Sequence, residues 1–243
     1  MQYKTAFFLI ALANFLTSFT TFIGVWFLMD RFQAVQGFTF NEVMICFAAV
    51  LMSFSLAELF GRGFDTFPRM LTNGEFDRAL VRPHNIVFLV IAAKIEFTRI
   101  GRLMQAVFVF LYAIPKSGIV WTGDKIFTLF LMVACGMLVF FGLFLVYAAF
   151  SFFTVEGLEF MNIITDGGRE FGSYPYSIYG ENVLKFLTYI VPLALFQYYP
   201  LLYLIGREES ISFMLMPLVS LLFLIPCYAF FRYGLSKYKS TGS

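Results

Sequence analysis

The stretch that decides the fold is IFTLFLMVACGMLVFFGLFLVYAAF, Ile126 to Phe150, which contains no charged side chain. As an α-helix it is longer than the ~30 Å of hydrocarbon in a bilayer, because each residue adds about 1.5 Å. Comparable apolar runs cover residues 5–29, 42–60 and 211–231. None of them alternates as the strands of a membrane barrel do. The sequence therefore predicts an all-α membrane protein with a single transmembrane domain.

The composition supports this class. The chain has 243 residues, of which 60% are hydrophobic and 13% charged, whereas soluble domains carry about a quarter charged residues. Cys46, Cys135 and Cys227 all lie inside apolar runs, so we expect them to be small packing residues without disulfides. The single histidine, His84, cannot build a metal cluster.

The third expected span covers residues 100–114 and ends at Pro115. The segment KIEFTRIGRLMQ, residues 94–105, leads into it. Lys94, Thr98 and Arg102 recur there at helical spacing, as does Gln105. This pattern predicts a helix that enters along the membrane surface before the span begins.

Residues 151–182 are the hardest segment to place, since acidic and basic side chains surround a Gly167-Gly168 break. They form either a connection on the inner side followed by a fifth span, or a short fifth span followed by a helix that dips in from the outer side. Broken helices at membrane depth need protein or a water-filled cavity around their freed backbone groups. Pro192 and Pro200 are therefore pathway candidates, with ordinary proline kinks as the alternative.

The distribution of positive charge predicts the orientation. With the N-terminus inside, eleven Lys and Arg residues lie on the inner side and four in the outer loops, leaving Arg169 and Lys185 unassigned. Positive residues accumulate on the cytoplasmic side of membrane proteins. We therefore expect both termini in the cytoplasm.

The stretch LTNGEFDRALVRPHN, Leu71 to Asn85, separates two strongly apolar runs. Four arginines lie between Arg62 and Arg82, and each would cost roughly 2.5–3.5 kcal/mol at the centre of a spanning helix. This segment therefore lies outside the bilayer, on the inner side. Its acids beside its arginines favour a short helix against a protein partner over a solvated loop.

Several familiar catalytic patterns are absent from the sequence. There is no phosphate-cradling G-x-x-x-x-G-K-[ST] loop, no H-E-x-x-H and no G-x-S-x-G. We therefore expect no enzyme activity from this chain alone and no bound cofactor. Matched interrupted helices in the two halves, typical of inverted-repeat transporters, are not visible either.

Four polar residues fall within the apolar segments. Asn14, Glu58, Gln105 and Gln197 could line a substrate route, although hydrogen bonding between helices is the simpler interpretation for Asn14 and Gln105. Glu58 lies near the inner end of its span, and the alternative for this residue is that it simply reaches the membrane interface.

Five stretches of the chain resemble one family, the permease subunits of bacterial type-2 ABC exporters. They are GEFDRALVRP (Gly74–Pro83), SFFTVEGLEF (Ser151–Phe160), GREFGSYPYSIY (Gly168–Tyr179), FLTYIVPLALFQYYP (Phe186–Pro200) and GLSKYKSTGS (Gly234–Ser243). They follow the family's order and extend over most of the chain, from Gly74 to Ser243. The stretch before the first span is short for this family, so we expect its surface-lying helix to be absent or abbreviated.

The resemblance implies six transmembrane helices in the bacterial cytoplasmic membrane, with N- and C-termini cytoplasmic. It implies that residues 62–85 form a cytoplasmic coupling helix between spans two and three. The coupling residues would be Arg69, Gly74, Glu75, Asp77, Arg78, Arg82 and Pro83. It also implies re-entrant helices before the last span, which makes Pro175, Pro192, Gln197 and Pro200 pathway or re-entrant candidates, together with Asn14.

The expected function is that of a permease subunit of an ATP-driven exporter. Two ATP-binding subunits would bind ATP and Mg, and a second permease subunit, a related partner rather than an identical copy, would complete the pathway. Membrane lipid is the other expected partner, and no nucleic acid is expected. The alternative is a secondary transporter or channel that works without ATP.

Overall fold

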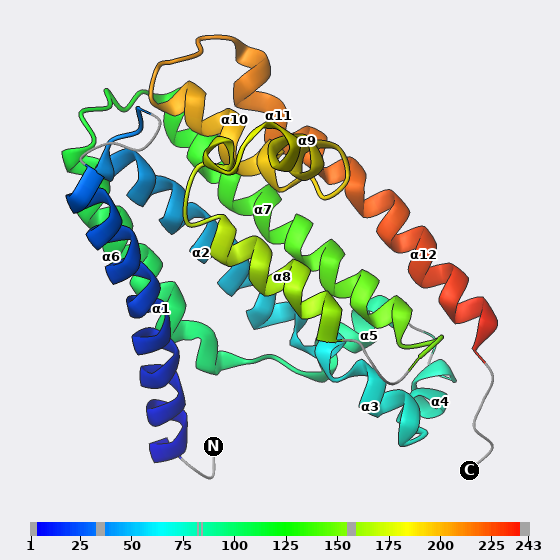
Figure 1. Cartoon of the computed structure of the whole chain (residues 1–243). Coiled ribbons are helices and arrows are strands. Elements are labelled where there is room, and N and C mark those ends of the chain that lie inside the picture. Colours follow the sequence, from blue (N-terminus) through cyan, green and yellow to red (C-terminus); the bar gives the residue numbers. More distant parts are fainter. Residues whose placement is uncertain (1–3, 33–36, 82, 84, 155–158, 239–243) are drawn as a thin grey trace.

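The computed structural model describes residues 4–32, 37–81, 83, 85–154 and 159–238, and no β-strand occurs within these ranges. The helices that build the body of the bundle (Figure 1) are α1 (Lys4–Phe32), α2 (Phe40–Asp65), α6 (Ile100–Lys116), α7 (Gly123–Phe150), α8 (Glu159–Phe171), α11 (Ile211–Ser220) and α12 (Leu224–Lys237). The shorter helices are α3 (Phe67–Thr72), α4 (Glu75–Leu80), α5 (Ile86–Ala93), α9 (Glu181–Tyr189) and α10 (Leu193–Leu204). Three 3₁₀ turns connect them, η1 (Phe97–Arg99), η2 (Tyr176–Tyr179) and η3 (Leu221–Phe223).

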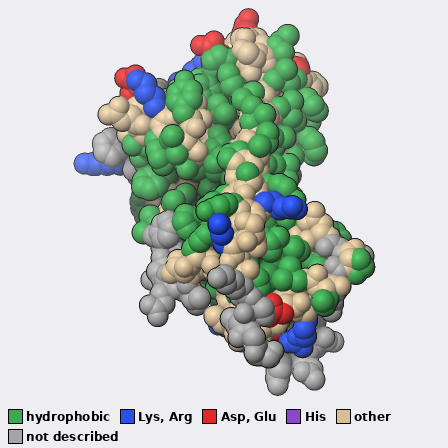
Figure 2. All heavy atoms as spheres, turned by 90° about the vertical axis from the view of Figure 1, so that its right-hand side faces the viewer, with side chains coloured by type: hydrophobic (Ala, Val, Ile, Leu, Met, Phe, Trp, Pro, Cys, Tyr) green, Lys and Arg blue, Asp and Glu red, His purple; other side chains and the backbone are tan. Residues whose placement is uncertain are grey.

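Five helical segments in the described residues are long and apolar enough to cross a membrane, or six if α9 and α10 count as one broken span. The five are Phe7–Phe27, Phe40–Thr72, Phe97–Lys116, Gly123–Phe150 and Ile211–Lys237. The predicted all-helical membrane fold is therefore confirmed. Figure 2 shows hydrophobic side chains over much of the face on which α12 lies, with acidic and basic side chains near both ends.

The hard-to-place residues 151–182 and the segment that follows them contain one short helix, α8, and one pair of helices, α9 and α10, that meet at a bend. α8 has 13 residues, about 20 Å at helical rise, which is too short to cross the hydrocarbon alone. It lies beside α2 and α7 (Figure 1). α9 and α10 then meet at a bend of 112°, in the half of the bundle away from α3 and α4 (Figure 1). A bend of this kind belongs to a broken span or to a re-entrant pair, so the second placement, a short fifth span followed by a helix that dips in from the outer side, stays a prediction.

α2 is the centre of the bundle. It begins at Phe40, where the Glu42 carboxylate accepts a hydrogen bond from the Thr39 backbone N–H at 2.8 Å, as in a capping box. Every residue from Val43 to Leu51 is buried, because α6 and α7 pack on either side of α2 and α10 also contacts it. A helix buried all round must be apolar all round, which explains why this stretch carries no helical amphipathicity.

The continuous helix expected over residues 94–105 is wrong. Lys94 has extended backbone angles, and η1 comes between it and the start of α6 at Ile100. The Glu96 N–H donates to the Leu59 carbonyl of α2 at 3.1 Å, so tertiary contact satisfies the backbone where the helix breaks. Lys94 therefore does not share a helix face with Arg102.

The predicted burial of the cysteines is confirmed, since Cys46, Cys135 and Cys227 are all buried and free. Gln105 is also buried, but its amide has no hydrogen-bond partner among the described residues. The interhelical hydrogen bond expected for Gln105 is therefore not seen there.

Close helix packing requires glycine where α1 meets α6. A Cβ built on Gly101 would overlap the carbonyl oxygen of Ala11. Backbone cannot move aside as a flexible side chain can, so α6 would have to withdraw from α1. Gly24 lies in α1 itself, and a Cβ there meets nothing within 4 Å.

We expect Gly101→Ala to lower the stability of the detergent-purified protein by about 1–3 kcal/mol, the usual cost of overpacking. Gly24→Ala is the matched control and should leave the melting temperature unchanged or slightly higher, because alanine favours helix over glycine. Equal melting temperatures for the two variants would contradict the close α1–α6 contact.

Candidate functional site

Three helices turn polar side chains toward two neighbouring pockets, which together we call the polar groove. α1 contributes Asn14, Thr17, Ser18 and Thr21, and α8 contributes Asn162, Thr165, Asp166, Arg169 and Glu170. Residues three and four apart share one face of a helix, so each set forms a single stripe. α2 supplies the floor with Phe47, Leu51, Phe54, Glu58 and Arg62, which are spaced in the same way.

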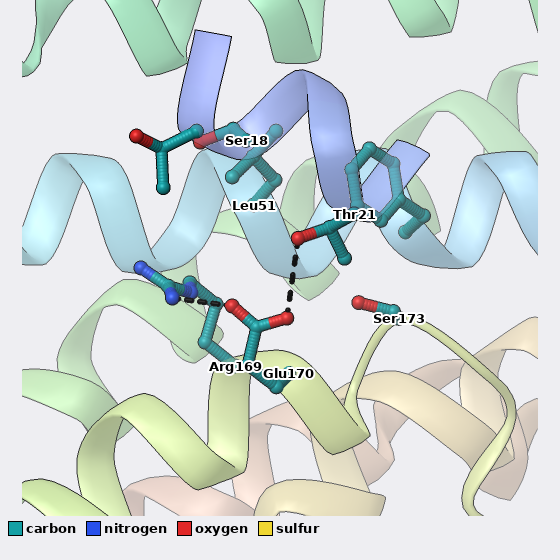
Figure 3. A pocket seen from close by; sticks show the side chains of 8 residues that line it. Ser18, Thr21, Leu51, Arg169, Glu170 and Ser173 are labelled. Atoms are coloured by element: carbon teal, nitrogen blue, oxygen red, sulfur yellow. Dashed lines mark hydrogen bonds and ion pairs between the residues drawn. The ribbon is translucent and has the colours of Figure 1, made fainter. Parts of the chain in front are cut away.

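One end of the polar groove is a recess of about 20 Å³, which is room for roughly one water molecule. Figure 3 shows Ser18 and Thr21 of α1 on one side and Arg169 and Glu170 of α8 on the other, with Leu51 of α2 between them. The Thr21 hydroxyl donates to the Glu170 carboxylate at 3.3 Å, and Arg169 pairs with the same carboxylate. This contact connects α1 to α8 across the groove.

The other end of the polar groove is a larger cavity of about 340 Å³, which we call the arginine cavity. It lies between α2, α6, α7 and α8. Its lining residues are Phe54, Glu58, Arg62, Arg99, Arg102, Phe144, Tyr147, Asn162, Thr165 and Asp166. Phe54, Glu58 and Arg62 are the continuation of the α2 stripe, so the recess and the arginine cavity follow one another along α2.

Glu58 is the anchor of the arginine cavity. Its carboxylate lies 2.5 Å from Arg102, 3.3 Å from Arg99 and 3.9 Å from Arg62. Glu58 and Arg102 are only 5% and 8% exposed. A buried carboxylate is costly unless it is paired and hydrogen-bonded, and these guanidinium groups provide both. Of the two alternatives expected for Glu58, its burial in the cavity lining favours the route over a side chain that simply reaches the membrane interface.

Asn14 joins the first helix to this cluster. Its side-chain oxygen accepts from Arg99 at 2.9 Å, and its amide donates to the Thr98 carbonyl at 3.4 Å. Across the groove, Asp166 pairs with Arg169 at 3.5 Å, and the Arg169 guanidinium lies 5.0 Å from the centre of the Phe54 ring. The charges thus connect α1, α2, α6 and α8. Among the expected pathway or re-entrant residues, Asn14 is the one that hydrogen-bonds to a lining residue of the arginine cavity, Arg99.

The other pathway or re-entrant candidates cluster around α9 and α10. Pro192 precedes α10 at the bend, Pro200 is buried inside α10, and buried Pro175 precedes η2. The Gln197 amide donates to the carbonyls of Tyr174 at 2.7 Å and Gly172 at 3.3 Å. Gln197 therefore holds the turn after α8 against α10 and satisfies backbone groups where the helices break.

The predicted coupling segment forms two short helices. α3 ends at Thr72, Asn73 follows, and Gly74 adopts a left-handed backbone with φ +67°, which glycine adopts without a Cβ penalty. α4 then begins at Glu75. Its first turn carries Glu75 and Asp77 and its last turn Arg78, which complements the helix dipole.

Aromatic side chains fasten the buried face of α4 to the bundle. Phe76 is fully buried, with its ring centre 5.1 Å from those of both Phe67 and Tyr238 and 5.8 Å from that of Phe152. Edge-to-face pairs of this kind add stability beyond burial alone. The Tyr238 hydroxyl also donates to Asp77 at 3.0 Å. Burial and this carboxylate raise the pKa of Tyr238, so it stays a donor at neutral pH.

The opposite face of the coupling segment is exposed. It presents Arg69, Glu75, Arg78 and Pro83, and beside them Val81 is 83% exposed. Arg82 lies outside the described residues. The exposed face therefore combines both charge signs with an uncovered apolar side chain.

The arginine cavity was missed by sequence analysis because its charges come from distant segments. Glu58 and Arg102 are 44 residues apart. The available signal was one carboxylate inside a span together with arginines at the start of the next, since intramembrane charges are usually paired.

We expect Glu58→Gln to destabilise the protein by about 3 kcal/mol, which is the lower end of the range for breaking a buried ion pair. The lower end applies because the adjacent polar cavity is large enough for water, which can hydrate the arginines left without their carboxylate. The measurement is thermal unfolding in detergent. Glu181→Gln breaks the exposed Glu181–Lys185 pair and is the control, with a change of at most ~0.5 kcal/mol. A loss at Glu58 no larger than at Glu181 would contradict the anchoring role.

The geometry agrees with comparisons to known proteins. A family model described as ABC-2 family transporter protein matches residues 15–242. No curated protein and no solved structure matches the chain. Since the match covers nearly all of the sequence, including the polar groove and the coupling segment, the chain belongs to the ABC-2 transporter family.

Proposed function

We propose that this multi-pass ABC permease is driven by separate ATP-binding subunits that dock on the exposed face of α3 and α4. The family makes the chain a transport component that pairs with an ABC ATP-binding subunit. The observation that carries the docking site is the two-sided character of α4. Its outer face offers Glu75 and Arg78, beside Arg69 of α3, while its inner face is buried in the aromatic cluster.

The aromatic cluster provides the mechanical connection. Phe67 and Phe76 contact Phe152, just after α7, and Phe67 also contacts Phe231 of α12. α3 itself follows α2 after one residue, Thr66. A displacement of the coupling segment by a docked ATPase would therefore reach α2, α7 and α12 together, and α2 carries Glu58 and the floor of the polar groove.

The polar groove is the substrate route in this proposal. Polar side chains inside a membrane are costly and usually face a cavity or a bundle interior, and here three stripes converge on two neighbouring pockets. A second permease subunit, a related partner rather than an identical copy, would complete the route. ATP and Mg would be bound by the ATPase, whose closure would switch the route between inner and outer access.

The proposed orientation places α3 and α4 in the cytoplasm of a bacterial cell, with the permease in its cytoplasmic membrane. The described starts and ends of the chain, Lys4 and Lys237, lie at the same end of the bundle as α3 and α4 (Figure 1). Arg69 and Arg78 are exposed there, as the excess of cations on the cytoplasmic side requires.

We expect the triple reversal Arg69→Glu, Glu75→Lys and Arg78→Glu to weaken co-purification of the ATP-binding subunit by at least about tenfold, equivalent to ~1.4 kcal/mol. All three side chains are exposed, so the fold should survive. Asp77 is left unchanged because it accepts a hydrogen bond from Tyr238.

The matched control reverses an exposed pair elsewhere, Glu181→Lys with Lys185→Glu on α9. It should co-purify as the wild type does. Full retention of the ATPase and of its substrate-stimulated hydrolysis after the triple reversal would refute α3–α4 docking.

Topology can be tested by cysteine labelling, because the native cysteines are buried. Asn73→Cys and Glu208→Cys would place single exposed thiols at opposite ends of the bundle. We expect a membrane-impermeant maleimide to label Glu208→Cys in intact spheroplasts and Asn73→Cys only in inside-out vesicles. The reverse pattern would invert the orientation and remove α4 from the ATPase.

A further inference from the structure

We propose that the arginine cavity is an anion-binding subsite of the substrate route, in which guanidinium groups bind the negatively charged oxygen group of the transported molecule. The statement that this molecule is a substrate rests on the proposed function. The binding of an anion by the cavity does not, and it can be measured on the chain alone.

The charge balance of the arginine cavity favours an anion. Arg62, Arg99 and Arg102 surround the single carboxylate of Glu58, at 3.9, 3.3 and 2.5 Å. The second carboxylate in the lining, Asp166, pairs with a fourth guanidinium, Arg169, at 3.5 Å. Arg169 also pairs with Glu170, so among the ion pairs of the described residues four cations share three anions. Like charges this close repel, and more strongly where the dielectric is low, so an additional anion would stabilise the group.

The hydrogen-bonding pattern leaves donors available. Arg102 uses one terminal nitrogen for Glu58, and its Nε has no partner among the described residues although the side chain is buried. The Nε of Arg99 is likewise without a partner. A buried donor left unsatisfied is costly. The planar guanidinium edge is suited to bidentate binding of a phosphate or carboxylate.

The size and lining of the cavity are those of a binding site. A volume of about 340 Å³ is in the range of small-ligand pockets, which begin at roughly 300 Å³. Asn162 and Thr165 of α8 add polar groups to the lining, while Phe54 and Phe144 add aromatic surface.

The position of the cavity relates it to the transport route. Glu58 and Arg62 lie on the same stripe of α2 as Leu51 and Phe47 of the recess, and Arg169 pairs with Glu170 at the recess and with Asp166 at the cavity. An anion bound among the arginines would therefore sit at the end of the polar groove nearer to α3. It would also contact α2, the helix that continues toward the coupling segment.

The test is equilibrium binding to the full chain purified in an uncharged detergent. The probes are a lysophosphatidic acid, a lysophosphatidylcholine with the same acyl chain, and inorganic phosphate. We expect the lysophosphatidic acid to bind at least about tenfold more tightly than its choline counterpart, whose phosphate charge is compensated. This preference should shrink as salt is added, because screening weakens charge pairing.

Arg62→Gln and Arg99→Gln should each reduce the preference at least about threefold, as expected for loss of one charge-assisted contact. Both variants keep Arg102 on Glu58, so the carboxylate remains paired. Arg62→Lys should retain part of the preference. The matched control is Arg207→Gln, an arginine at the opposite end of the bundle near Glu42, which should bind as the wild type does. Melting temperatures without probe verify the folding of each variant.

The outcomes separate cleanly. If inorganic phosphate binds as well as the lysophosphatidic acid, the result supports the anion site and identifies its ligand as a free anion. If only the lysophosphatidic acid binds, the ligand is a lipid headgroup. Equal binding of the two lysolipids, or a preference that persists in both glutamine variants, would overturn the proposal. If the bound anion does not change the rate of ATP hydrolysis by the complex with the ATPase, this contradicts the assignment of the anion as a transported substrate. The binding result would still stand.

Discussion

The bundle depends on one buried carboxylate. Glu58 pairs with Arg62 of its own helix and holds Arg99 and Arg102 against α2, and through Arg99 it also holds Asn14 of α1. In an apolar surrounding, a single unpaired charge would cost several kcal/mol, so the register of α2 against α6 is constrained by this pairing. The same contact leaves a polar space beside the helices rather than a packed core. The ion pairs of Glu58 thus both stabilise the bundle and line the candidate route.

α2 is the element shared by every functional feature of the molecule. Its first half is buried and anchors α6 and α7, while one stripe from Phe47 to Arg62 forms the floor of the polar groove. Beyond Asp65 the chain turns at Thr66 into α3, and α4 is fastened by Phe76 to Phe152 and Tyr238. A continuous physical path therefore connects the outer face of the coupling segment with the arginine cavity.

The sequence was sufficient where a local property decides the structure. Long uncharged runs such as 126–150 predict membrane helices, and the acids beside arginines within residues 71–85 predict a short helix. It was insufficient for Lys94 to Glu96, because a backbone hydrogen bond to Leu59 interrupts the helical periodicity. It was also insufficient for α8, whose 13 residues are too short and too polar for a span by composition. The role of each face of α8 depends on which helices pack against it, and the sequence does not specify these neighbours.

By itself, the sequence determined the class of the protein, the helical segments and the location of the charged connection, since hydrocarbon thickness and side-chain transfer energies act on each segment separately. Only the tertiary structure decided that Glu58 faces Arg99 and Arg102, that the stripes of α1 and α8 meet over α2, and that α9 and α10 bend back on each other. These features depend on the register between helices far apart in the chain, which is set by packing and pairing of side chains that no local pattern specifies.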